Sequence, residues 1–327
     1  MIDEEVPPVR GSKPSSQGTT MLRAYLVALS LICLTGCSSN WAFYAPTHEI
    51  SRSPDSYSYA YEEIWIDSES GNRLNAQIHF SGGSNPAGMV MHFHGNRGNI
   101  TETFEKVEWL LDEGFDVVVF DYSGYGKSDG TPTPETTYLD ARSMLSFLNK
   151  FERPNNHYKK IVWGTSLGGA IMMSGLSSSA ESHDLELVIV DSSFYSYQKT
   201  AVHVVSQYPL GGLITWLPAI FVDDKYAPES RLDGLPDTPI LFSHCDTDAL
   251  IPMEFTKGMY DMASGQKALW ILPGCKHARS FANEHPENQN LLMQVLDEPE
   301  RISPQYTYAK ALKDFNAQLL AVERDNL

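Results

Sequence analysis

Residues 164–168 read Gly-Thr-Ser-Leu-Gly, which matches the pattern G-x-S-x-G around Ser166. An apolar run typical of a buried strand precedes this pentapeptide, and a helix-forming run follows it. Between a strand and a helix, the two glycines permit a sharp turn that exposes the serine hydroxyl at the head of the helix, where the helix dipole favours negative charge. Ser166 is therefore the candidate nucleophile.

A serine hydroxyl attacks a carbonyl carbon effectively only when a base takes its proton and an acid orients that base. Two later segments supply these groups, because Asp248 ends the segment 239–248 and His277 ends the segment 267–277, each of which begins with an apolar run. The order Ser, Asp, His along the chain is the one that accompanies a serine on a strand-to-helix turn. We predict that His277 is the general base and Asp248 the acid.

Each of these two residues has a competitor nearby in the sequence. Asp246 lies closer to the strand end than Asp248, and we favour Asp248 because the loop must run past the strand before its carboxylate can turn toward the histidine loop. His285 competes with His277, but it lies farther from the last strand in a polar stretch. His244 is predicted to be structural, at a strand end.

An oxyanion hole requires two backbone N–H groups that point at the oxygen where charge develops. The amide of Leu167 directly follows the nucleophile, and the amide of Asn96 lies in the loop 94–99, which reads His-Gly-Asn-Arg-Gly-Asn. His92 and His94 alternate along the preceding strand, which could suggest a metal ion, but no acid accompanies them. We therefore predict neither a metal nor a cofactor.

The elements that position these residues alternate between apolar runs and helical stretches, the pattern of a mostly parallel sheet with helices on both faces. The expected strands begin the segments 88–96, 115–126, 160–169, 187–193, 239–248 and 267–277, and residues 63–67 and 73–80 should form an antiparallel hairpin before them. Residues 195–239 lack strand character and are predicted to form a small cap. Residues 306–323 have apolar positions at helical spacing and should pack on the sheet.

Together, the loop 94–99, the segment 121–128 (Asp-Tyr-Ser-Gly-Tyr-Gly-Lys-Ser), the serine turn, the aspartate loop and the histidine loop resemble the α/β-hydrolase superfamily. Within it, the branch of the bud-emergence-homologue hydrolases and the protein depalmitoylases is the most similar. The likeness runs from about Glu62 to His277. It implies an α/β-hydrolase fold and hydrolysis of esters, thioesters or occasionally amides through an acyl-enzyme.

The sequence departs from this family at three positions. Ser123 stands where arginine is frequent, Cys245 stands where glycine is usual, and Cys275 replaces a small residue before the catalytic histidine. The two cysteines end neighbouring predicted strands, and an exported protein is exposed to oxidation. We therefore predict a Cys245–Cys275 disulfide that joins the aspartate loop, which carries Asp248, to the histidine loop, which carries His277.

The first 57 residues are expected to lie outside the folded domain, which we place at 58–327. Residues 1–20 are polar and are either upstream of the true start or an unstructured leader. Met21 begins a short basic and then apolar run that is typical of a secretory signal. Residues 34–37 (Leu-Thr-Gly-Cys) resemble a bacterial lipobox, which implies lipid on Cys37; a plain signal peptide or an anchor helix is the alternative. Residues 38–57 then form a tether with some aromatic packing.

The composition limits the partners that the chain can have. Its 327 residues carry a formal net charge of −17, which disfavours binding to nucleic acid, because phosphates require Lys and Arg. The sequence predicts a serine hydrolase of small-molecule or lipid esters and thioesters, exported and anchored by lipid to a bacterial membrane, on the periplasmic face of the outer membrane. The alternatives are a peptidase on the same scaffold and a non-catalytic surface lipoprotein.

Overall fold

The computed structural model describes residues 43–152, 158–178, 184–209 and 211–325. The predictions for residues 1–20, the signal sequence 21–37 and the lipidated Cys37 fall outside these described residues. In the part of the chain that the structure describes, no helix is both long and apolar enough to cross a membrane.

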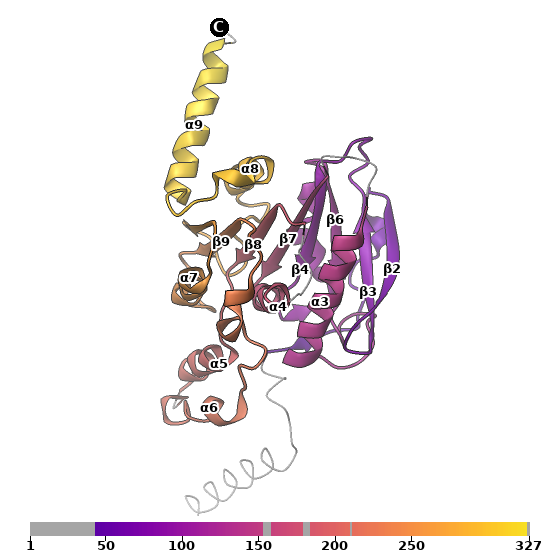
Figure 1. The fold of residues 1–327 in the computed structure, drawn as a ribbon, viewed down its shortest axis with the longest axis vertical. Helices are drawn as coiled ribbons and strands as arrows, with labels where there is room; N and C mark the ends of the chain where they lie inside the picture. The colour runs from indigo at the N-terminus through magenta and orange to yellow at the C-terminus, as the bar shows by residue number, and fades with distance from the viewer. Residues whose placement is uncertain (1–42, 153–157, 179–183, 210, 326–327) are drawn as a thin grey trace, which may run out of the picture.

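An eight-stranded sheet forms the centre of the domain, in the order β10-β9-β8-β7-β4-β6-β3-β2 (Figure 1). The pairs β2–β3 and β3–β6 are antiparallel and all others are parallel. The strands are β2 (Tyr61–Asp67), β3 (Arg73–His79), β4 (Gly88–Phe93), β6 (Phe115–Phe120), β7 (Lys159–Thr165), β8 (Leu187–Asp191), β9 (Ile240–Cys245) and β10 (Lys267–Leu272). The predicted hairpin and the six predicted parallel-sheet strands are thereby confirmed.

Helices connect the strands and cover both faces of the sheet. The α-helices are α2 (Ile100–Thr103), α3 (Pro134–Lys150), α4 (Leu167–Leu176), α5 (Tyr197–Ser206), α6 (Pro218–Phe221), α7 (Met253–Met262), α8 (Pro286–Asp297) and α9 (Tyr308–Asp325). The 3-10 helices are η2 (Pro54–Ser56), η3 (Phe104–Lys106), η4 (Glu108–Leu111), η5 (Gly211–Leu213), η6 (Pro228–Ser230), η7 (Leu232–Gly234) and η8 (Pro299–Arg301).

Strand β6 shows how the sheet divides the core into two layers. All six of its residues are buried, as expected of a parallel strand covered on both sides. Val118 and Phe120 pack in the cluster formed with α3, α4 and α7, whereas Val117 and Val119 pack in the cluster formed with η4, α8 and the start of α9. The period of two along the strand therefore separates two hydrophobic cores.

The predicted cap lies between β8 and β9. It is helical and consists of α5, η5, α6, η6 and η7. Figure 1 shows α5 and α6 at one end of the molecule and α9 at the opposite end. The cap follows the carboxyl end of β8, which is the edge of the sheet where ligand sites of open α/β sheets lie.

Two boundary predictions differ from the structure. Phe43 and Tyr44 are buried, and β1 (Ala45–Pro46) pairs with β5 (Arg97–Gly98), so packed structure begins well before residue 58. The aromatic packing expected of this segment is present, since the Phe43 ring contacts Tyr197 and Tyr44 is buried, but the folded domain begins before the predicted boundary at residue 58. In α9, Leu319 and Leu320 are exposed, because the helix contacts the sheet near its start and then extends beyond it.

Candidate active site

Ser166 lies on the sharp turn between β7 and α4. Its φ of 55° and ψ of −121° place it in a region that residues other than glycine rarely adopt. The Ser166 N–H donates to the Asp191 carbonyl at 2.8 Å, which fixes the turn against the end of β8. The strained turn projects the hydroxyl above the strand ends, as the G-x-S-x-G pattern predicts.

The glycines around this turn allow the backbone to pack closely. A Cβ at Gly168 would overlap the carbonyl oxygens of Phe93 and His94 at the end of β4. A Cβ at Gly164 would lie 2.5 Å from the Cα of Gly169. Any side chain at these positions would push α4 away from the sheet and move the Ser166 hydroxyl.

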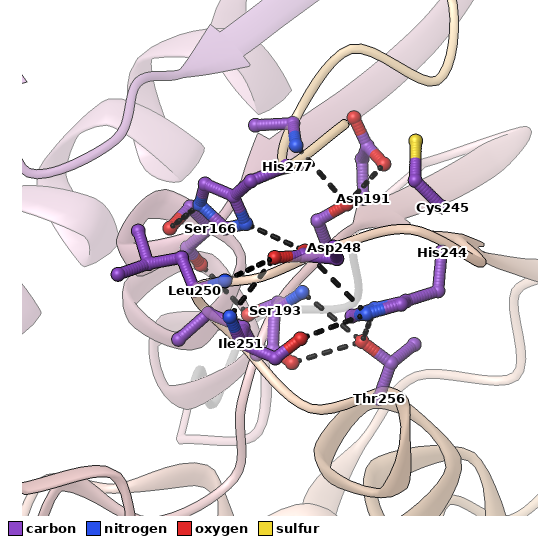
Figure 2. A network of polar contacts seen from close by, with 12 residues as sticks. Ser166, Asp191, Ser193, His244, Cys245, Asp248, Leu250, Ile251, Thr256 and His277 are labelled. Atoms are coloured by element: carbon purple, nitrogen blue, oxygen red, sulfur yellow. Dashed lines mark hydrogen bonds and ion pairs between the residues drawn. The ribbon is translucent and has the colours of Figure 1, made fainter. Parts of the chain in front are cut away.

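The three residues predicted from the sequence lie in one hydrogen-bonded chain (Figure 2). His277 Nε2 is 2.9 Å from Ser166 Oγ, and His277 Nδ1 is 2.7 Å from Asp248 Oδ2. With the proton on Nδ1, His277 donates to the carboxylate and accepts from the serine hydroxyl. This arrangement matches a nucleophile, a base and an orienting acid.

The Asp248 side chain is 1% exposed and is held by several groups. Its Oδ1 accepts hydrogen bonds from the amides of Leu250 and Ile251, both at 2.9 Å. Burial alone would raise the pKa of Asp248, but the hydrogen bonds from His277 and these amides outweigh it, so the pKa lies below its ordinary value. Asp248 is therefore ionised at neutral pH and can stabilise a protonated His277.

The competing residues make other contacts. Asp246 Oδ1 accepts from the Gly274 amide at 2.8 Å, and His285 lies 3.6 Å from Glu287 at the start of α8. His244 lies behind Asp248, with Nε2 3.0 Å from the Ile251 carbonyl and 3.5 Å from Asp248 Oδ2. Burial lowers the pKa of His244, so it supports the acid loop as a neutral imidazole.

The predicted oxyanion loop lies beside the nucleophile. A Cβ at Gly95 would be 3.7 Å from the Cβ of Ser166. The Asn96 carbonyl accepts from Tyr125 Oη at 2.8 Å and from the Ala45 amide at 2.9 Å. Within the described ranges, the amides of Asn96 and Leu167 donate no hydrogen bond to other backbone groups, so both remain available for a substrate oxygen.

His92 and His94 each contact a neighbouring residue of the fold. His92 Nε2 is 3.0 Å from Thr165 Oγ1, and His94 Nδ1 is 2.8 Å from the Gly95 carbonyl. Burial lowers the pKa of His94 to about 4, so its ring is neutral. The hydroxyl of Tyr122 also donates to the His94 carbonyl at 3.0 Å. These contacts fix the loop that carries Asn96.

Several attachments hold the loop that carries His277, and three of them reach β9, η3 and β8. A disulfide joins Cys245 to Cys275, with the two Cα atoms 5.1 Å apart. Lys106 Nζ donates to the Ala278 carbonyl at 2.8 Å, and Ser280 Oγ donates to Asp191 Oδ1 at 2.5 Å. Ala278 has a φ of 56°, so the backbone next to the histidine is itself constrained. His277 is thus held by contacts of residues that precede it and of residues that follow it in the chain.

Asp191 and Lys106 are the charged groups beneath this loop. Asp191 Oδ1 also lies 3.1 Å from Ser192 Oγ and 3.2 Å from Ser243 Oγ. Burial raises the pKa of Asp191 and lowers the pKa of Lys106. Both side chains line a cavity of about 10 Å³, close to the smallest size that admits one water. Neither residue was predicted from the sequence as part of the site, because neither belongs to a motif.

Comparison with known proteins agrees with this architecture. Residues 84–232 match the model of the serine aminopeptidase S33 family, a match that includes Ser166 and ends before Asp248 and His277. The esterase Pf2001 of Pyrococcus furiosus is similar in structure, with a TM-score of 0.60 and 20% sequence identity. The match covers 80% of this chain and 98% of the esterase. The protein has the α/β-hydrolase fold. The predicted fold class is therefore confirmed.

Curated sequence relatives match most of the chain. YfhR of Escherichia coli strain K12 is 28% identical over 264 residues, which are 80% of this chain and 87% of YfhR. Protein bem46 of Schizosaccharomyces pombe is 24% identical over 72% of this chain and 77% of its own length. Lysophosphatidylserine lipase ABHD12 of Danio rerio is 25% identical over 64% of this chain and 58% of its own length.

Proposed function

We propose that this protein is a serine hydrolase that cleaves carboxylic esters or thioesters, with Ser166 as nucleophile, His277 as general base and Asp248 as the orienting acid. The observation that carries the proposal is the continuous hydrogen-bonded chain from Ser166 Oγ through both ring nitrogens of His277 to Asp248 Oδ2. Acyl transfer by a serine needs an exposed nucleophile, a base and an ionised acid that orients the base, and this site contains all three.

The reaction begins when Ser166 Oγ attacks the carbonyl carbon and His277 Nε2 takes the hydroxyl proton. The carbonyl oxygen then carries negative charge, which the Leu167 and Asn96 amides stabilise. His277 passes the proton to the departing alcohol or thiol and leaves an acyl group on Ser166. A water molecule next gives a proton to His277 and attacks the acyl-enzyme, and the returned proton restores the Ser166 hydroxyl.

The names of two similar proteins favour ester substrates over peptides. An esterase resembles this chain over 80% of its length, and a lysophosphatidylserine lipase matches 64% of it. The aminopeptidase model, in contrast, matches only residues 84–232. A peptidase remains the second candidate, supported by that match.

The lipobox-like residues 34–37 support a further part of the proposal, in which the mature chain begins at an acylated Cys37 and is held at the periplasmic face of the outer membrane. The test is mass spectrometry of the N-terminal peptide from the membrane fraction. A peptide that begins at Cys37 with acyl groups is expected, and an unmodified Cys37 or a peptide continuous through residue 37 would contradict it.

Hydrolysis of p-nitrophenyl esters from acetate to palmitate tests the reaction itself. We expect activity that Ser166→Ala abolishes, with a chain-length optimum that separates a small-ester enzyme from a lipid-directed one. Absence of activity above the Ser166→Ala background at every chain length would reject the esterase proposal.

A further inference from the structure

The exposed apolar side chains of the cap are concentrated in one short segment. Six of the large hydrophobic residues that are exposed in the described part of the chain fall within the 14 positions from 208 to 221. They are Tyr208, Leu213, Ile214, Trp216, Ile220 and Phe221, with exposed fractions from 43% to 72%. We call this set the cap surface. Clustered exposed apolar residues mark interaction sites on soluble domains.

The chemistry of the cap surface suits an apolar partner. Residues 207–222 contain no Asp, Glu, Lys or Arg, although charged residues make up 20% of the chain. The only polar group of the Trp216 side chain, Nε1, donates to the Leu213 carbonyl at 3.1 Å. The indole ring thus presents apolar surface outward and keeps its N–H satisfied within the protein.

The cap surface lies at the same edge of the molecule as the candidate active site. The cap follows β8, whose last residue, Asp191, accepts the hydrogen bond from the Ser166 amide. Helix α5 contacts α7 through the rings of His203 and Phe255, 6.0 Å apart. At the start of α7, Leu250 and Met253 are also exposed, directly beside Asp248.

The first described residue of the chain packs against the cap. The ring of Phe43 lies 5.1 Å from the ring of Tyr197 in α5. The predicted lipid attachment at Cys37 is six residues earlier, and six extended residues span at most about 20 Å. A lipid on Cys37 would therefore hold the base of the cap within that distance of a bilayer.

We infer that the partner of the cap surface is the interfacial region of a lipid bilayer, into which Trp216 and its neighbours insert so that the active-site edge faces the membrane. The inference rests on the lipid attachment proposed above. Tryptophan and aliphatic side chains favour this depth of a bilayer. Because residues 207–222 lack cations and the chain carries a net charge of −17, the contact does not depend on anionic lipids.

The depth of Trp216 in a membrane tests the inference. The full-length protein, purified from membranes, is reconstituted in phosphatidylcholine vesicles that carry bromine near the top of the acyl chains, and tryptophan fluorescence is recorded. All proteins carry Trp41→Phe, because Trp41 lies only four residues from Cys37 in the sequence. In this background we expect quenching that Trp216→Phe largely removes. Trp65→Phe is the matched control, because Trp65 is 41% exposed on the edge strand β2, away from the cap. It should leave the quenching unchanged.

A charged substitution provides a second test. Leu213→Glu with Ile220→Glu should abolish the quenching of Trp216 by brominated lipid, because it places two carboxylates in the proposed contact. Leu319→Glu with Leu320→Glu, at the exposed end of α9, is the control and should leave it unchanged. Replacing half of the lipid by phosphatidylglycerol should not increase the quenching in any of these proteins.

Several outcomes would overturn the inference. Quenching of Trp216 by acrylamide but not by brominated lipid would show that this side chain faces water. Protection from both quenchers would show that protein, such as a second copy or residues 1–42, covers the surface instead. A chain that does not float with vesicles overturns the inference too. Mass spectrometry of Cys37 and the ester assay on the same sample report separately on the proposed function.

Discussion

At the scale of single residues, the candidate site depends on contacts between positions far apart in the sequence. The hydrogen bond from Ser166 to His277 joins residues 111 positions apart. The hydrogen bond from His277 to Asp248 completes the chain. Together with the amides of Leu250 and Ile251, it holds the pKa of Asp248 below its ordinary value despite burial. Substitution of the Asp248 side chain therefore leaves these two amide donors in place.

Replacing Asp248 with Asn tests the role of that charge. The amide keeps the size of the side chain, but it cannot stabilise a protonated His277, and it favours the wrong tautomer. We expect kcat on a p-nitrophenyl ester to fall by about 10³- to 10⁴-fold. Asp246→Asn is the matched control and should retain nearly full activity, because Asp246 bonds to Gly274. Equal losses in both variants would contradict the assignment.

Sequence patterns predicted the residues that lie at motif positions and missed those that act through tertiary contacts. Ser166, Asp248 and His277 each end a predicted strand or begin its loop, so their order and position were informative. Lys106 and Asp191 lie under the histidine loop, but 85 positions of sequence separate them. Asp191 ends a predicted strand, as Asp248 does, yet nothing in the sequence pairs it with Lys106. Their partnership arises only when η3 packs beside the end of β8.

At the scale of elements, the histidine loop is the part that other elements must immobilise. The disulfide attaches it to β9, Lys106 attaches it to η3, and Asp191 attaches it to β8. Because a displacement of about 1 Å in a catalytic group can cost about 100-fold in rate, these attachments bear on catalysis as well as stability.

Lys106→Met tests the positioning of the loop. The substitution removes the donor to the Ala278 carbonyl, so we expect kcat per titrated active site to fall by about 10- to 100-fold with KM little changed. Lys199→Met, which removes a surface ion pair with Glu229, is the control and should have no effect. A lower melting temperature with unchanged kcat per active site would show that Lys106 has only a structural role.

The elements themselves were largely predictable, because unbroken apolar runs and turn residues identify buried strands. The exceptions have local causes. Residues 43–57 are polar overall, yet Phe43 and Tyr44 supply enough apolar surface to pack against the core. The apolar periodicity of α9 continues to Leu320, but the sheet it covers ends earlier, so the last apolar positions have no surface to meet.

At the scale of the whole molecule, buried histidines make stability depend on pH. His79 is fully buried, stacks on Phe104 with ring centroids 4.1 Å apart, and has a pKa lowered by burial to about 4. The folded state therefore keeps it neutral, whereas the unfolded chain binds a proton below about pH 6.5. Protons taken up only by the unfolded chain lower stability as the pH falls from about 6.5 to 4.

His79→Phe removes this titration and keeps an aromatic ring for stacking. Between pH 7 and pH 5, we expect the variant to lose about 2 kcal/mol less unfolding free energy than the wild type, because one fewer proton is taken up on unfolding. Urea denaturation at the two pH values measures the difference. The same pH dependence in both proteins would contradict the assignment of a neutral, buried His79.

The central claim is that Ser166 is an activated nucleophile within an intact chain of Ser166, His277 and Asp248. Reaction with a fluorophosphonate, followed by peptide mass spectrometry, tests it most directly. We expect one phosphonyl group per molecule, on the peptide that contains Ser166. Labelling should be lost in Ser166→Ala and strongly slowed in His277→Ala. No labelling, or labelling on another residue at the same rate in both variants, would contradict the account.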